Sequence, residues 1–313
     1  MNDELLVLSE EDLAFLRMVL EVFPVPESPL RFLDEEDREP ADPGATFESL
    51  VSRGLFHESG GGATEELRAR LGPVSECRAR VSLNLRGETN DSEEMHEFFV
   101  TESGAVQYSH TDSGHAFGRP TSEEELAARL AAMFHTAPEG SNRELRLSAG
   151  DYLAFAVFAR DVRGQDEEEP IDSMSVDEVL AYFDEPETPF VKSPNEDAWV
   201  ESVDNLAKLR VLVKREHGYE LHPTLHALAR ELTADRHSAV HRFDFLDDQW
   251  LMREVNLYPT QDTVYRLGTS NDGSVVIQEL SVSGLESVLA RIVSTLPNLL
   301  DPDAAPQVAS AHG

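Results

Sequence analysis

The sequence is poor in the residues that most often reveal a protein's chemistry or surroundings. A single cysteine, Cys77, stands in 313 residues, which excludes an intramolecular disulfide framework and a zinc site built from several thiolates. No apolar run is long enough to cross a bilayer, the longest being 152–159, and residues 1–12 are acidic where a signal peptide would be basic. We therefore expect a cytoplasmic protein without membrane insertion.

Lysine and isoleucine are also scarce, whereas carboxylates are abundant. Asp and Glu number 60 against 26 Lys and Arg, so the net charge is −34 at pH 7. A chain of this charge repels nucleic acid and anionic lipid, so we expect neither as a partner. The acidity is spread over both halves, and only three lysines (Lys192, Lys208 and Lys214) and three isoleucines occur, which together indicate a halophilic, GC-rich host. The alternative is an acidic surface that binds a basic protein.

The apolar pattern predicts a regular order of elements in the first half. A helix capped by Ser9, with Leu13, Leu16 and Leu20 at helical spacing, is apolar nearly all round and is expected to lie inside the protein. Helices over 47–54 and around Leu67 follow. Alternating apolar residues then predict four strands and a closing helix that begins near Ser122, with the strands around 81–85, 98–101, 105–110 and 115–117.

The second half repeats that order. Helices around Trp199 and from Pro223 precede four strands and a closing helix that carries Leu285 and Leu289, with the strands near 240–246, 251–257, 263–267 and 274–279. Matching positions such as Leu50 and Leu206, or Leu130 and Leu289, differ by 156 to 159 in residue number. We therefore predict an internal duplication within an α+β fold: two pseudo-symmetric repeats, each with helices, an antiparallel four-strand meander and a closing helix.

The remaining segments set the expected boundaries. The strand signal at 144–147 is expected to extend the first sheet, 151–162 to form a buried helix and 176–183 a short amphipathic helix. The division predicted is an N-terminal repeat half over 1–162, an acidic linker over 163–170, a C-terminal repeat half over 171–300 and a disordered tail over 301–313.

No motif announces a reaction. His222 and His226 have zincin spacing, but Pro223 stands where the catalytic Glu belongs. His237 and His241 lie in a predicted strand, where residues four apart cannot chelate one ion. The three glycines at 60–62 lack the Lys of a phosphate loop, no G-x-S-x-G elbow occurs, and Cys77 is expected to be a small buried side chain. We assign no catalytic residue, cofactor-binding residue or metal ligand, and expect a protein that is not an enzyme and has no cofactor.

Aromatic residues gather in the predicted sheets. The core is the favoured place for them, and an exposed apolar sheet face that binds a partner segment is the alternative. The residues concerned are Phe98, Phe99, Tyr108 and Phe117 in the first half and Trp250, Tyr258 and Tyr265 in the second.

Several segments resemble the EspG family of type VII (ESX) secretion-associated proteins: LSEEDLAFLRMVLEVFPVPESPLRF, FESLVSRGLF with its Arg53-Gly54-Leu55 ending, TSEEELAARLAAMF and RELRLSAGDYLAF. The resemblance implies a pseudo-twofold α+β fold and a cytosolic chaperone or adaptor that holds a helical protein substrate. No binding residue is carried over, because the substrate-binding loops cannot be matched position by position. An enzyme with its site between the two halves and an acidic decoy for a basic protein remain as alternatives.

Overall fold

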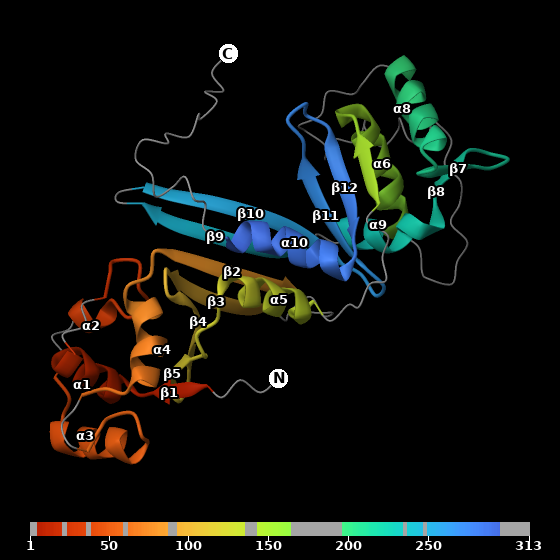
Figure 1. Ribbon diagram of the computed structural model, residues 1–313. Coiled ribbons are helices and arrows are strands. Elements are labelled where there is room, and N and C mark those ends of the chain that lie inside the picture. The colour runs from red at the N-terminus through yellow and green to blue at the C-terminus, as the bar shows by residue number, and fades with distance from the viewer. Residues whose placement is uncertain are drawn as a thin grey trace.

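The protein combines helices with a large antiparallel sheet, which confirms the α+β prediction (Figure 1). The computed structural model describes residues 5–20, 24–35, 39–58, 62–86, 93–134, 143–163, 196–233, 237–246 and 249–294. Most of the predicted acidic linker, the helix expected at 176–183 and the tail at 301–313 lie outside these residues.

Ten strands form one sheet in the order β1-β5-β4-β3-β2-β9-β10-β11-β12-β6. The strands are β1 (Leu6–Leu8), β2 (Ala79–Arg86), β3 (Glu93–Thr101), β4 (Gly104–Thr111), β5 (Gly114–Phe117), β6 (Glu144–Leu147), β9 (Ser238–Leu246), β10 (Gln249–Pro259), β11 (Val264–Thr269) and β12 (Val275–Leu280). The central pair is β2 with β9, antiparallel, with Val81 opposite Arg242. Read outward from that pair, each half runs through its own meander in chain order. This arrangement has the expected pseudo-symmetry, while duplication as its origin stays a prediction.

The helices are short and several carry side-chain caps. Ser122 caps one of them with Glu125 in a reciprocal capping box, as the sequence predicts. The helices are α1 (Glu10–Leu20), α2 (Phe32–Glu35), α3 (Pro43–Ser52), α4 (Glu65–Ser75), α5 (Glu123–Met133), α6 (Ala149–Arg163), α8 (Glu196–Lys208), the 3-10 turn η1 (Pro223–Leu225), α9 (His226–Thr233) and α10 (Val282–Val293).

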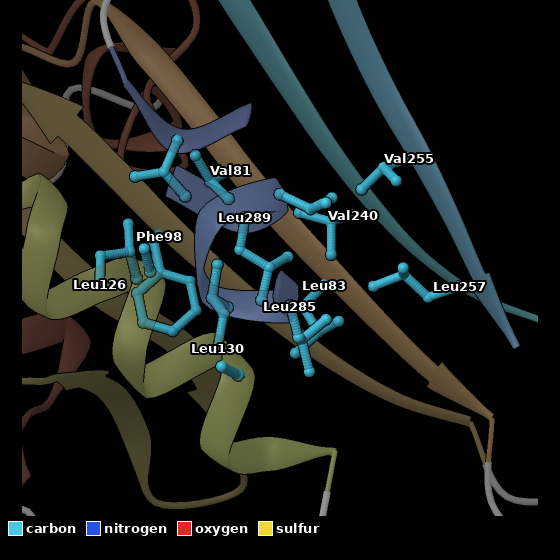
Figure 2. Close-up of a cluster of buried hydrophobic side chains, with 14 of the residues drawn as sticks. Val81, Leu83, Phe98, Leu126, Leu130, Val240, Val255, Leu257, Leu285 and Leu289 are labelled. Atoms are coloured by element: carbon cyan, nitrogen blue, oxygen red, sulfur yellow. The ribbon is translucent and has the colours of Figure 1, made fainter. Parts of the chain in front are cut away.

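The closing helices of the two halves, α5 and α10, pack against each other and on one face of the sheet (Figure 2). Leu126 and Leu130 of α5 and Leu285 and Leu289 of α10 point toward the apolar side chains of β2, β3, β9 and β10. Burial of these side chains from both halves in one cluster is the main hydrophobic contribution at the centre of the molecule. The halves therefore share a core.

The opposite face carries two separate groups of helices, one toward each end of the sheet (Figure 1). At the N-terminal end, α1, α3 and α4 cover Phe99, Tyr108 and Phe117. At the C-terminal end, α6, α8 and α9 cover Tyr265 and Ile277. Strand alternation places these rings opposite the side chains that face α5 and α10. We call these groups the N-terminal lobe and the C-terminal lobe.

Two expectations were wrong. The strand at 144–147 does not extend the first half of the sheet: β6 pairs with β12, and α6, which follows it, packs in the C-terminal lobe. The first helix is not enclosed on all sides, because Met18 and Val19 of α1 are exposed. The sequence pattern did not predict β1, or the separate two-stranded hairpin of β7 (Leu212–Lys214) and β8 (Tyr219–Leu221). These strands have three residues each, too few for alternation to show.

Candidate functional site

Between the two lobes, the middle of the sheet has a face that no described helix covers. We call it the central face. It is made of side chains from four neighbouring strands: Met95 and Glu97 of β3, Arg80, Ser82 and Asn84 of β2, His241, Phe243 and Phe245 of β9, and Trp250, Met252 and Glu254 of β10.

Strand periodicity dictates which residues reach this face. In β2, Val81 and Leu83 are buried toward α5 and α10, so Arg80 and Ser82 point the other way. Register then aligns the strands into rows. Phe99, Arg80, Phe243 and Met252 stand opposite one another in successive pairings, so they form one row across the sheet. Phe99, at one end of the row, is buried beneath the N-terminal lobe.

One part of the central face is apolar and exposed. Trp250 is 62% exposed and Met252 55%. Met95 is 65% exposed, but it stands opposite Asn84 in a different row and is not part of this group. The Trp250 ring meets Phe245 edge to face with 5.3 Å between centroids and Phe243 with 6.3 Å. Tryptophan is rarely exposed to this extent in a soluble monomer, and methionine adapts readily to varied apolar partners. The chemistry of this part suits contact with another apolar surface.

Arg80 connects the apolar part to a polar part. Its guanidinium carbon lies 4.9 Å from the centroid of the Phe243 ring, and its Nη1 lies 3.4 Å from Oε1 of Glu97. Each contact restricts the long arginine side chain, since the ring attracts the cation and the carboxylate fixes the direction of its end. One face of the Phe243 ring is therefore covered by the Arg80 guanidinium.

The polar part is the next row across the sheet. Ser82 stands opposite Glu97 on one side and His241 on the other, and His241 stands opposite Glu254. The Nε2 of His241 lies 3.8 Å from Oε2 of Glu254, too far for a direct hydrogen bond. With its two carboxylates, this acidic row separates the apolar group around Trp250 from Met95, which stands opposite Asn84 in the row beyond it.

The histidines considered as metal ligands have local roles. The Nδ1 of His222 lies 2.8 Å from the Thr224 hydroxyl, and Nε2 of His226 lies 2.9 Å from the Leu221 carbonyl oxygen. His237 and His241 occupy the start and middle of the β9 region, where the strand separates them. Within the described parts of the chain, no three His, Cys, Asp or Glu side chains are arranged to hold a metal ion.

Cys77 is the small buried side chain that the sequence predicts. Burial, with a smaller contribution from the nearby charge of Glu27, raises the pKa of its thiol to about 12. The opposing effect of Arg80 is smaller. A thiol of this kind is not a nucleophile near neutral pH.

The aromatic residues divide between core and surface. Phe98, Phe99, Tyr108, Phe117 and Tyr265 are buried, as the core interpretation predicts. Tyr258 is half-buried against the C-terminal lobe, and Trp250 is exposed, which the alternation in QWLMREVNLYP could have revealed. In that strand, Val255 and Leu257 face the core, which leaves Trp250 and Met252 on the other side.

Comparisons with known proteins support the fold. No protein-family model and no curated protein matches the sequence. Among solved structures, the chain is similar to the Mycobacterium tuberculosis type VII secretion system chaperone EspG5, which was solved in complex with the PE25-PPE41 dimer. The TM-score is 0.50 at 12% sequence identity, and the match covers 94% of this chain and 97% of that chain.

At this identity the likeness is one of fold. The resemblance to EspG suggested by the order of elements is therefore supported at the level of architecture, across nearly the whole chain. The structural neighbour is a chaperone seen with protein partners. No helix in the described ranges is both long and apolar enough to span a membrane.

Proposed function

We propose that the protein is a non-enzymatic chaperone or adaptor of the cytosol, and that its central face binds an apolar, helical segment of a protein partner. The observation that carries the proposal is the exposed apolar pair of Trp250 and Met252, beside Phe243 and Phe245, between two helical lobes. A partner that covers this cluster removes apolar surface from water, which is the main driving force of protein association.

Two further observations support this kind of partner. The EspG-like fold belongs to a chaperone that was solved with a bound protein dimer, so the architecture is compatible with such a role. The sheet edges offer no better place, because β1 and β6 have only three and four residues. A helical secretion substrate is the specific partner we propose.

The test is copurification of the tagged protein from its host at the salt concentration of the cytosol. The proposal requires a small, predominantly helical protein that binds again after both are purified. Trp250→Ala and Met252→Ala should each weaken that complex, with a loss of about 2 kcal/mol, or roughly thirtyfold, for the tryptophan. Both side chains are exposed, so the melting temperature of the free protein should change little.

Met18→Ala is the matched control. Met18 is an exposed methionine on α1, outside the central face, so its removal should leave binding unchanged. Equal losses for Met18→Ala and Met252→Ala would contradict the proposal. A complex with a basic protein whose affinity falls steeply as salt rises would instead support the acidic decoy, because salt screens contacts between charges but not apolar contacts.

A further inference from the structure

A basic cluster stands at one end of the C-terminal lobe of this acidic protein. Residues 208–215 include four basic residues and no carboxylate, in a chain with 60 acidic and 26 basic residues. They run from the last residue of α8 through β7, and the β7–β8 hairpin projects from the lobe (Figure 1). We call this set the basic hairpin: Lys208, Arg210, Lys214 and Arg215.

All four side chains are exposed, and their contacts are unequal. Arg215 forms an ion pair with Glu220 across the hairpin. Lys214 lies over the Tyr219 ring at 5.8 Å, and Lys208 reaches the Asn205 amide oxygen at 3.5 Å. Among the described residues, the Arg210 guanidinium has no hydrogen bond or ion pair, and its neighbour Leu209 is 48% exposed. Two carboxylates, Glu216 and Glu220, lie on the same hairpin, so the four cations leave it a net charge of +2, beside the apolar side chain of Leu209.

Arg210 has an unusual backbone conformation. Its φ is 59°, and it is the one non-glycine residue with positive φ in the described part of the chain. The left-handed region costs free energy for any residue with a Cβ, and glycine is its usual occupant at the end of a helix. Arg210 therefore adopts a backbone conformation that its own side chain disfavours.

The first half of the chain supplies the comparison. The end of α3 has the same hydrogen bonds as the end of α8, but with Gly54 in the left-handed position. Gly54 donates to the Val51 carbonyl at 2.9 Å, and Arg210 donates to the Ala207 carbonyl at 3.1 Å. The next residue then donates to the Leu50 or Leu206 carbonyl, at 2.9 Å in both cases. Glycine is thus sufficient for this turn, and what Arg210 adds is an exposed guanidinium.

We propose that the basic hairpin is a docking surface for a carboxylate-rich segment of a protein partner, with an apolar residue of that segment against Leu209. Arginine and lysine at this spacing complement carboxylates, and Arg210 can bind one in a bidentate manner. A short acidic segment fits better than a nucleic acid, because a long polyanion would be repelled by the net charge of −34 while a short segment contacts mainly the hairpin. This surface is distinct from the central face, so its test does not depend on the proposed function.

The experiment measures binding of a fluorescein-labelled peptide, rich in glutamate with two leucines, to the full chain by anisotropy. The control peptide has glutamine in place of glutamate and should not bind. Arg210→Gly should weaken binding about fivefold, and Lys208→Gln combined with Lys214→Gln by a similar factor. Arg68→Gln, which removes an exposed arginine of α4 in the N-terminal lobe, should leave binding unchanged.

Arg210→Gly is informative because glycine suits the left-handed backbone, so the variant should melt at or above the temperature of the parent protein. Unchanged peptide affinity in this folded variant would overturn the proposal, as would equal affinity for the glutamine peptide. Single-stranded DNA that displaces the peptide with higher affinity would also overturn it, because the hairpin would then be a general polyanion site.

Discussion

The Nε of Arg242 donates to Oδ1 of Asp244 at 2.8 Å inside the protein, where the two side chains are almost fully buried. Arg253 donates to the other carboxylate oxygen of Asp244 at 3.1 Å. The same two arginines also donate to carbonyls at the end of α10, Arg242 to Val293 and Arg253 to Ser294. Asp244 thus pairs with both arginines, and because each arginine also binds a carbonyl at the end of α10, the three residues link α10 to β9 and β10.

Asp244→Ala should destabilise the protein by about 3–5 kcal/mol, because it leaves Arg242 buried without its nearest counter-charge. Urea unfolding followed by circular dichroism measures the loss. Glu102→Ala removes the exposed partner of Arg78 and should cost less than about 1 kcal/mol. Similar losses for the two variants would show that the buried ion pair does not stabilise α10 in the way described.

His115 should make stability depend on acid pH. Burial lowers its pKa, the nearby His110 lowers it further, and Glu10 partly opposes them. Tyr108 contacts Nδ1 at 2.8 Å and Phe32 stacks on the ring at 5.1 Å. Because the folded state binds this proton less readily than the unfolded state, stability is complete above about pH 6.5 and is lost as pH falls toward the lowered pKa.

Melting temperatures across this pH range test the effect. His115→Gln should lower stability at neutral pH, since Tyr108 loses its imidazole partner, and the gap from the parent protein should narrow in acid. His57→Gln, at an exposed position, is the control and should follow the parent curve. A gap that stays constant with pH would show that His115 does not contribute through its proton.

Cys77 should report unfolding. Its thiol is buried and its pKa is raised to about 12, so a thiol reagent such as DTNB should not label the folded protein at pH 8. Labelling should rise in urea along the same curve as circular dichroism. Rapid labelling of the fully folded protein would contradict the burial of this residue.

Gly114→Ala should loosen the N-terminal strand. The φ of Gly114 is 127°, and a Cβ there would lie 2.4 Å from the Leu8 carbonyl oxygen of β1. We expect a loss of about 1–3 kcal/mol and faster hydrogen exchange in β1. Gly273→Ala has a positive φ but open space around it, so it should cost less and leave β1 unaffected.

Most of the fold follows from local patterns. Alternation in RVSLNLR predicts the strand around 81–85, and Ser9 predicts the start of α1, where its hydroxyl accepts from the Asp12 backbone. The sequence does not predict the pairing of β2 with β9, because neither strand has a residue pattern that identifies a partner so distant in the chain. The same reason explains why β6 was expected at the wrong end of the sheet.

The candidate sites were hidden for different reasons. The sequence favours the core for Trp250 because most aromatic side chains are buried, whereas the alternation in its strand and its pairing opposite Phe245 place it on the outward face. The left-handed conformation of Arg210 could not be predicted from the sequence, because glycine is the residue that signals a positive φ and none stands at this position.

The central pairing of β2 with β9 also sets the order of events during synthesis. About 150 residues separate Arg86, where β2 ends, from Ser238, where β9 begins. At roughly 5–20 residues per second, a ribosome needs about 8–30 s to translate that interval. Throughout this time β2 is an unpaired edge on a nascent chain, so aggregation should be most severe when translation stalls before β9 emerges.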